Sequence, residues 1–117
     1  MRCPCHSGEE YTQCCQPYHG GAAAATPEKL MRSRYSAYAL GLVDYILLTQ
    51  TLSTAREQLS AFCKKTEFRG LEILSVESEH VTFRATLFQG DIDVSFTERS
   101  LFKKRGGRWL YVQGKIL

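Results

Sequence analysis

Between residues 26 and 65, hydrophobic side chains recur at the spacing of α-helices. Thr26, Pro27 and Glu28 predict a helix start, because threonine caps the first turn, proline suits the first helical position and glutamate complements the positive end of the helix dipole. Gly41 is expected to end this first helix. Three helices are therefore predicted, over residues 27–41, 44–51 and 54–65.

After Gly70 the hydrophobic pattern changes from a helical period to alternation, which is typical of half-buried strands. Glycine-containing turns are expected at residues 89–91 and 106–107. The predicted strands cover residues 71–76, 81–87, 92–104 and 109–115. Turns this short can join only antiparallel neighbours. Helices followed by such a meander indicate an α+β domain, in which the helices pack on one face of a curved antiparallel sheet.

Four of the five cysteines lie within the first fifteen residues, at Cys3, Cys5, Cys14 and Cys15. Thiols this crowded indicate either a disulfide framework or a metal site. The two cysteines of each neighbouring pair are too close along the chain to bridge comfortably, so two crossed disulfides would have to tie one short loop. Four thiolates satisfy tetrahedral Zn²⁺ without any further ligand, so we expect one structural zinc ion. A redox or metal-transfer site, which needs exposed thiolates of lowered pKa, is the alternative.

The cysteine segment is expected to form a unit of its own. Gly20 and Gly21 break regular structure where this segment ends. Metal binding supplies folding energy that so short a segment could not gain from a hydrophobic core. We predict a zinc knuckle over residues 1–20 and an α+β domain over residues 21–117, with the whole core after Thr26. The second unit is then expected to fold without the first.

Other residues near the cysteines, and the fifth cysteine itself, have simpler interpretations. His6 and His19 are alternative metal ligands, but exposed positions in a loop explain both. Gly8 is expected to supply the positive φ that a tight metal loop needs. Cys63 falls on the apolar side of the helix over residues 54–65, where a lone cysteine is more often a small core residue than a nucleophile.

The composition of the 117 residues bounds the classes of function. With 44% hydrophobic residues, the chain can bury one core of ordinary domain size. The net charge of +3 does not by itself indicate nucleic acid as a partner. No apolar run reaches the roughly 18 residues of a membrane span, and no apolar segment follows Met1 and Arg2 as in a secretory signal. Zinc-type cysteines without an export signal are typical of the reducing cytoplasm, which is the expected location.

A polar pair is expected inside the α+β domain. Arg34 falls close to the apolar stripe of the first helix, and a buried arginine needs a carboxylate partner. Alternation that starts at Ile92 turns Glu98 inward. The two would form an internal ion pair or the polar end of a pocket, whereas a β-bulge near Thr97 would leave Glu98 in water. The candidate pocket residues are Arg34, Tyr35, Tyr38 and Glu98.

The predicted hairpin around residues 106–107 combines aromatic and basic side chains. Trp109 and Tyr111 share one strand face, and four basic residues surround the turn, at Lys103, Lys104, Arg105 and Arg108. An aromatic face beside basic residues can stack single-stranded nucleic acid. Core aromatics next to a solvated turn are the other interpretation, and the commoner one.

The N-terminus resembles the SEC-C motif, the zinc knuckle found at the C-terminal tail of the preprotein translocase ATPase SecA. That motif reads C-x-C-x₈-C-[CH], which the four N-terminal cysteines match position for position. The flanking residues Pro4, Ser7, Gly8, Tyr11 and Pro17 are also similar to it. The resemblance implies bound Zn²⁺. By analogy it also implies that the knuckle contacts a protein partner, such as the export chaperone SecB or the ribosome.

The whole chain resembles the YchJ family of bacterial proteins. Four segments carry this resemblance in the same order, over residues 30–38, 70–73, 98–102 and 107–114. The family resemblance implies an N-terminal SEC-C knuckle followed by a cone-shaped α+β domain of the nuclear-transport-factor-two-like, or cystatin-like, type. It implies no particular reaction.

Two hypotheses about function follow. The first is a zinc-binding interaction protein whose knuckle contacts a protein partner. The alternative is a small-molecule binder or enzyme that uses the cavity of the cone. No histidine is expected to face that cavity, since His80 falls in a polar turn and the other two histidines lie in the knuckle, so no catalytic residue is assigned. A homodimer through the outer face of the sheet and weak binding of nucleic acid are further expectations.

Overall fold

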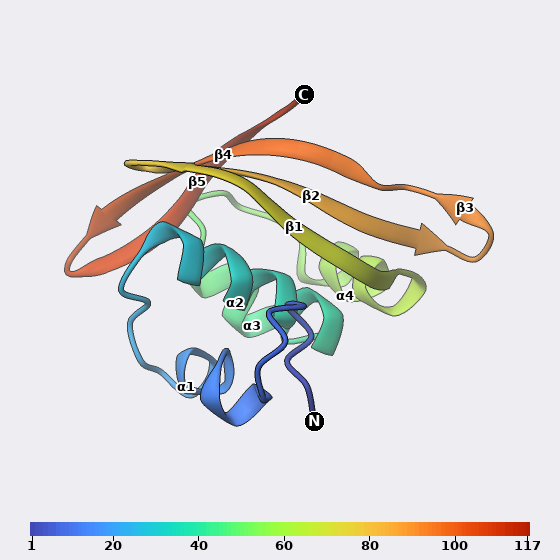
Figure 1. Ribbon diagram of the computed structural model, residues 1–117, viewed down its shortest axis with the longest axis horizontal. Helices are drawn as coiled ribbons and strands as arrows, with labels where there is room; N and C mark the ends of the chain where they lie inside the picture. The colour runs from blue at the N-terminus through green and yellow to red at the C-terminus, as the bar shows by residue number, and fades with distance from the viewer.

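A curved antiparallel sheet, a layer of helices on its concave face and the N-terminal cysteine segment make up the computed structural model, which describes residues 1–117 (Figure 1). Its elements are a 3₁₀ turn (Tyr11–Gln13), α1 (Gln16–His19), α2 (Pro27–Leu40), α3 (Val43–Leu48), α4 (Arg56–Lys65), β1 (Glu67–Glu77), β2 (His80–Gln89), β3 (Ile92–Asp93), β4 (Phe96–Arg105) and β5 (Arg108–Ile116). None of the helices has the length and apolar composition that a membrane span requires.

The long helix α2 begins and ends where its capping residues predict. The Thr26 side chain accepts a hydrogen bond from the Lys29 backbone N–H at 3.2 Å, and Gly41 closes the helix in the left-handed conformation, with φ +73°. Buried residues lie on several sides of α2, because it is covered by the sheet on one side and by the N-terminal segment on another (Figure 1). This helix therefore lies between the N-terminal segment and the sheet and packs against both.

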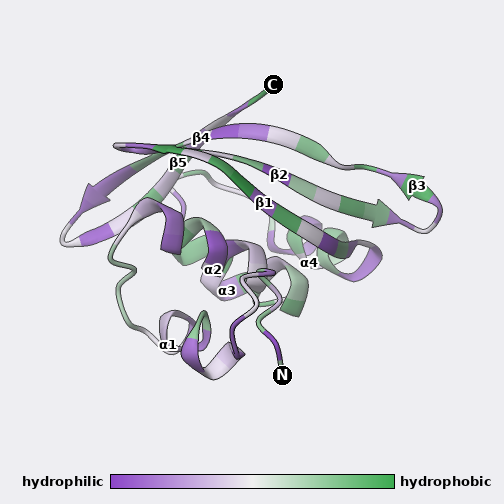
Figure 2. Cartoon of the chain, viewed as in Figure 1, coloured by the Kyte–Doolittle hydropathy of each residue, from purple (hydrophilic) through white to green (hydrophobic).

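The sheet has the strand order β1-β2-β4-β5, and β3 pairs with the end of β2. All of these pairings are antiparallel, as the short turns predict. Hydrophobic and hydrophilic bands alternate along β1 and β2 in Figure 2. The inward side chains of β2 are buried, and they are Val81, Phe83, Ala85 and Leu87. The α+β class with helices on a curved antiparallel sheet is thus confirmed.

The third predicted strand is interrupted. Ser95 accepts a hydrogen bond from the Leu87 backbone N–H through its side chain at 2.9 Å, and its own N–H donates to the Asp93 carboxylate at 2.9 Å. These side-chain bonds replace part of the strand ladder and separate β3 from β4. The expectation that Ile92 faces inward is consequently wrong, since its side chain is exposed.

The second helix is shorter than the pattern predicts. α3 ends at Leu48, because the next residues leave the helix to pair with β5. Tyr111 donates its backbone N–H to the Thr49 carbonyl at 2.8 Å, and Thr51 donates to the Tyr111 carbonyl at 3.0 Å. This pairing joins the end of α3 to the sheet and closes one side of the space between them.

The knuckle (residues 1–20) packs against the rest of the molecule as part of its core. Cys3, Cys5 and Cys15 are buried in the same hydrophobic cluster as Leu30 and Met31 of α2. The expectation that the whole core lies after Thr26 is therefore wrong. A short segment with little apolar surface gains burial by docking on a helix rather than by standing apart.

Candidate metal centre and cavity

The four N-terminal cysteines converge on one point. Their Sγ atoms all lie within 4.8 Å of one another, with 3.6 Å between Cys5 and Cys14 and 3.9 Å between Cys14 and Cys15. None of them forms a disulfide. Four sulfurs around a tetrahedral zinc ion would lie about 3.8 Å apart, from a Zn–S distance of about 2.3 Å. The four thiols therefore have the spacing that a tetrahedral metal ion requires.

Local backbone geometry brings the two cysteine pairs together. Gly8 has a φ of +88°, as predicted for a tight loop, and the Cys3 backbone N–H donates to the Glu9 carbonyl at 2.8 Å. His6 also has a positive φ, of 61°, and its Nε2 donates to the Phe68 carbonyl at 3.1 Å. This turn places Cys3 and Cys5 beside the second pair.

The electrostatics of the cluster favour a cation. A hydrogen bond from the Cys15 thiol lowers the pKa of Cys5 to about 4. Burial raises the pKa of Cys14 to about 11, and the hydrogen bond to Cys5 raises the pKa of Cys15. The protein alone thus stabilises one thiolate at the expense of its neighbours, and a bound metal cation would remove that conflict. The redox alternative needs exposed thiolates, whereas three of the four thiols are buried.

The two histidines of the knuckle contribute to its docking. His19 donates from Nε2 to the Ser33 carbonyl at 2.8 Å and accepts at Nδ1 from the Tyr11 hydroxyl at 2.6 Å. Both of its ring nitrogens are therefore occupied by the protein. His19 is half-buried rather than exposed as expected, and burial lowers its pKa. His6 is exposed, as expected, and neither histidine belongs to the metal cluster.

Small polar residues of α2 form the seat of the knuckle. The Ser36 hydroxyl lies 3.3 Å from the Cys3 Sγ, and Arg32 donates from Nη1 to the Cys5 carbonyl at 3.2 Å. Ser33 and Ser36 are fully buried, at 0% exposure. Sequence reasoning missed these residues, because serines on a helix suggest a solvated face. The signal that could have found them is a pair of serines, three positions apart, in the middle of a helix.

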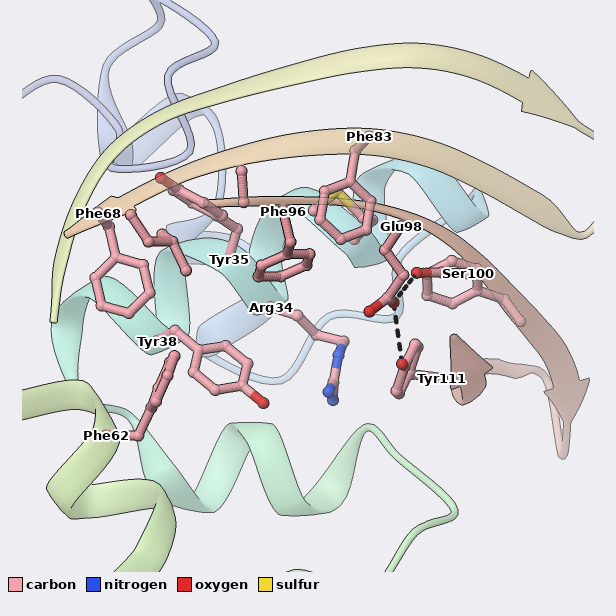
Figure 3. A pocket seen from close by; sticks show the side chains of 14 residues that line it. Arg34, Tyr35, Tyr38, Phe62, Phe68, Phe83, Phe96, Glu98, Ser100 and Tyr111 are labelled. Atoms are coloured by element: carbon pink, nitrogen blue, oxygen red, sulfur yellow. Dashed lines mark hydrogen bonds between the residues drawn. The ribbon is translucent and has the colours of Figure 1, made fainter. Parts of the chain in front are cut away.

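A cavity lies on the other side of α2, between that helix, α4 and the sheet (Figure 3). Its volume is about 180 Å³, and eleven of its fourteen lining residues are hydrophobic. The four candidate pocket residues all line it, and they are Arg34, Tyr35, Tyr38 and Glu98. Several lining side chains are only half-buried, so the cavity opens to solvent; these include Tyr38, Phe62, Phe96 and Glu98.

Arg34 holds the end of α3 from within the cavity wall. Its Nη1 donates to the Ile46 carbonyl at 3.0 Å and to the Thr49 hydroxyl at 2.8 Å, and its Nη2 donates to the Gln50 side-chain carbonyl at 3.0 Å. The guanidinium also lies over the Tyr111 ring, 4.7 Å from its centroid. Burial of the charge lowers the pKa of Arg34. All three acceptors are uncharged.

Glu98 points into the cavity from β4. The pairing of Phe83 with Glu98 continues the β2–β4 register without a bulge at Thr97, so the predicted alternation holds here. One carboxylate oxygen, Oε2, accepts from the Ser100 hydroxyl and, at 3.0 Å, from the Tyr111 hydroxyl. No nitrogen of Arg34 lies within ion-pair distance of Glu98, so the expectation of a direct internal ion pair is wrong. The two residues instead occupy the polar end of the cavity, joined through Tyr111 (Figure 3).

Gly114 of β5 makes room for this carboxylate. It lies opposite Ser100, and a Cβ at this position would collide with the Glu98 carboxylate and the Tyr111 hydroxyl. The only signal of this packing in the sequence is a glycine within a predicted strand. Such a glycine often marks a place where another group approaches the backbone closely.

Two other candidates from the sequence occupy structural positions. Cys63 is half-buried against the small cluster of Ala37, Ile46 and Leu59, and burial raises its pKa. Trp109 is half-buried and lines a second cavity beside the chain that follows the knuckle, where its indole N–H is buried without a partner. The Lys104 ammonium lies 5.9 Å from the Trp109 ring centroid. The aromatic ring is thus partly covered rather than displayed for stacking.

Comparison with known proteins decides the family. Residues 26–114 match the family described as YchJ, middle NTF2-like domain. The chain belongs to the YchJ family. It is 42% identical over 112 residues to a UPF0225 protein of Deinococcus radiodurans. The aligned residues cover 94% of this chain and 85% of that relative.

Two solved structures of SEC-C motif containing proteins are similar to this YchJ-family chain. The solution structure from Rhodopseudomonas palustris has a TM-score of 0.86 at 36% identity and covers 100% of this chain and 99% of its own. The crystal structure from Psychrobacter arcticus has a TM-score of 0.77 at 26% identity. The match covers 98% of this chain and 82% of that one. The resemblance read from the sequence and the NTF2-like fold are therefore confirmed. Four cysteines that could hold a metal ion occupy the SEC-C positions.

Proposed function

We propose that this YchJ-family protein is a zinc-binding interaction protein whose knuckle presents a surface to a protein partner. The observation that carries the proposal is the convergence of four Sγ atoms within 4.8 Å. The two similar solved structures, both of SEC-C motif containing proteins, support the proposal.

Zinc is the metal that this ligand set fits best. Four thiolates close a tetrahedral shell and leave no open position, which is the arrangement of structural zinc sites. Thiolates select zinc, copper(I) or iron over magnesium and calcium, which prefer oxygen ligands. Free thiols next to one another persist in a reducing compartment, and the same proposal places the protein in the cytoplasm.

The exposed side of the knuckle is the surface offered to a partner. One side of the knuckle is docked on α2, and many of its other residues are exposed, among them Thr12, Gln13, Gln16 and Pro17. Bound metal would fix the loops that display these residues. By analogy with the SecA tail, the partner is an export chaperone of the SecB type or the ribosome.

The test measures binding of zinc-loaded protein to purified SecB and to ribosomes by biolayer interferometry. Gln13→Arg should weaken binding at least about tenfold, because a long charged side chain at a packed interface costs roughly 1.4 kcal/mol or more. Gln113→Arg, a matched change at an exposed position of β5, should leave binding unchanged. Both variants should keep their metal.

Removal of zinc with a chelator should abolish binding in the same assay. Binding to neither partner would overturn this proposal, and so would binding that survives both chelation and Gln13→Arg.

Two other partners suggested by the sequence stay predictions. A second copy of the chain could meet the sheet at its edge strand β1, where Leu74 and Val76 are 49% and 47% exposed. Nucleic acid could meet the basic hairpin. We assign no reaction: the charged groups of the cavity are Arg34 and Glu98, and no histidine lines it.

A further inference from the structure

The polar end of the cavity contains hydrogen-bond donors that the protein leaves unused. A guanidinium has five N–H groups, and three of those on Arg34 donate within the protein, two from Nη1 and one from Nη2. The Nε–H and the second Nη2–H have no partner. Trp109 Nε1 is the one side-chain nitrogen or oxygen that is fully buried without a partner, so the unpaired Nε of Arg34 is not fully buried. Because Arg34 lines the cavity, we take its two unpaired N–H groups as the donors that a ligand there would meet.

Acceptor groups lie at the same end. Glu98 uses only Oε2 for its bonds to Ser100 and Tyr111, so Oε1 is free to accept. The Tyr38 hydroxyl makes no hydrogen bond, and Figure 3 shows it turned towards the Arg34 guanidinium. A ligand at this end would therefore meet two N–H donors, one carboxylate oxygen and one hydroxyl.

The charges of the cavity favour a ligand without net charge. Arg34 and Glu98 contribute one positive and one negative charge, and no other charged residue lines the cavity. A carboxylate ligand would bring a second negative charge close to Glu98, and an ammonium ligand would bring a second positive charge close to Arg34. A neutral group that both accepts and donates hydrogen bonds satisfies both residues.

The rest of the cavity has the size and walls for one aromatic ring. Its volume is about 180 Å³, somewhat more than the roughly 150 Å³ of an engineered apolar cavity that binds benzene. Phenylalanine rings form much of the wall, and two pairs already meet edge to face: Phe83 with Phe96 at 5.9 Å and Phe62 with Phe68 at 6.2 Å. A further ring can pack in the same way.

We propose that this cavity binds a compact aromatic carboxamide, with one ring among the phenylalanines and its amide at the polar end. The amide oxygen accepts from the unpaired N–H groups of Arg34, and the amide N–H donates to Glu98. This site gives a ligand class to the small-molecule alternative raised by the sequence. It is separate from the partner surface of the knuckle, so either proposal can fail while the other stands.

The experiment titrates the full-length, zinc-loaded protein with benzamide, benzoate and toluene and follows backbone amide shifts by NMR. Benzamide should shift amides of α2, β2 and β4 that flank the cavity, with a dissociation constant of about 1 mM or tighter, as expected for so small a ligand. It should bind about tenfold more tightly than either other probe. Tighter binding of benzoate would show an anion site, equal binding of toluene would show an apolar void, and no binding by any probe would show no site; each result overturns the proposal.

A charge-removing variant makes the test specific to Glu98. Glu98→Gln should shift the ratio of benzoate to benzamide affinity about tenfold towards benzoate, because the repulsion of the carboxylate is gone. Glu72→Gln, a matched change at an exposed position of β1, should leave the ratio unchanged. An unchanged ratio in folded Glu98→Gln overturns the proposal. If that variant does not fold, Gly114→Ala serves instead: its Cβ displaces the Glu98 carboxylate, so benzamide affinity should fall while toluene affinity does not. If Gly114→Ala binds benzamide as tightly as the wild type does, that result also overturns the proposal.

Discussion

At the scale of single residues, Arg34 connects α2 to three other parts of the molecule. It reaches from α2 to the last turn of α3, to the loop that follows and to the ring of Tyr111 on β5. Its partners are a backbone carbonyl, a hydroxyl, an amide and an aromatic face. An arginine can serve all four because its planar fork has five donors and a flat surface.

Replacement of Arg34 by methionine should destabilise the fold by about 2–4 kcal/mol, because it strands buried acceptors at the end of α3. Arg34→Lys should recover only part of this loss, since one ammonium cannot reproduce the fork. Urea unfolding measures both changes. A double-mutant cycle with Glu98→Gln should give a coupling below about 1 kcal/mol, because the two charges make no direct pair. A coupling near 3 kcal/mol would instead mean that Arg34 and Glu98 form the buried ion pair that the sequence suggested.

His19 should make stability depend on pH. Burial lowers its pKa in the folded state, so the unfolded chain takes up the proton first as the pH falls. The stability that depends on neutral His19 is therefore fully present above the unfolded value of about 6.5 and declines as the pH falls below it. Unfolding free energies at about pH 7.5 and about pH 5.5 should differ more in the wild type than in His19→Gln. His80→Gln should keep the wild-type difference, and an equal difference in all three proteins would contradict the role given to His19.

At the scale of elements, α2 lies between the cysteine cluster and the cavity and contributes residues to both. Its serines seat the knuckle, while Arg34, Tyr35 and Tyr38 face the cavity. The Tyr35 hydroxyl also donates to the Gly70 carbonyl at 2.8 Å, at an irregularity of β1. Loss of the knuckle or of the sheet would expose a side of α2 that is buried in the folded protein.

Deletion of residues 1–20 should therefore abolish cooperative unfolding. The sequence predicts that the remaining chain folds alone, but the contacts predict the opposite, because three buried cysteines and the Ser33 and Ser36 contacts go with the deleted segment. Circular dichroism during thermal melting compares the truncated and full chains. A sharp transition in the truncated chain, within a few degrees of the full chain, would restore the view of two independent units.

The elements that could be predicted from the sequence are those fixed by local chemistry. The caps Thr26 and Gly41 bound α2, and alternation along β2 and β4 places Glu98 on the inner face. The break at Ser95 could not be foreseen, since it depends on a side chain that bonds to another strand.

The candidate site likewise has features that local sequence predicts and features that depend on how distant elements pack. The spacing of the cysteines and the burial of Arg34 are local signals, and both are visible in the sequence. The partners of Arg34 and the seat of the knuckle on Ser33 and Ser36 arise only when distant elements pack, so no short-range pattern reports them. The sequence therefore indicated that Arg34 and Glu98 lie at one site, but not which groups Arg34 contacts directly.

At the scale of the whole molecule, the cysteine knuckle, α2 and the sheet lie in succession (Figure 1). The four-cysteine cluster lies at the interface between the knuckle and α2, and the cavity lies at the interface between α2 and the sheet. A metal ion in the knuckle would therefore brace a helix that forms one wall of the cavity. The proposed role of the knuckle depends above all on the four thiols acting together as zinc ligands.

The most direct test of that claim is the zinc content of full-length protein purified under reducing conditions without chelator, measured by elemental analysis. The account predicts about one equivalent of zinc, as in closed Cys₄ sites. Cys63→Ser should keep that equivalent, because Cys63 lies apart from the cluster, whereas Cys3→Ser combined with Cys14→Ser should lose it. Reduced wild-type protein that contains no zinc, or a double variant that retains it, would contradict the account.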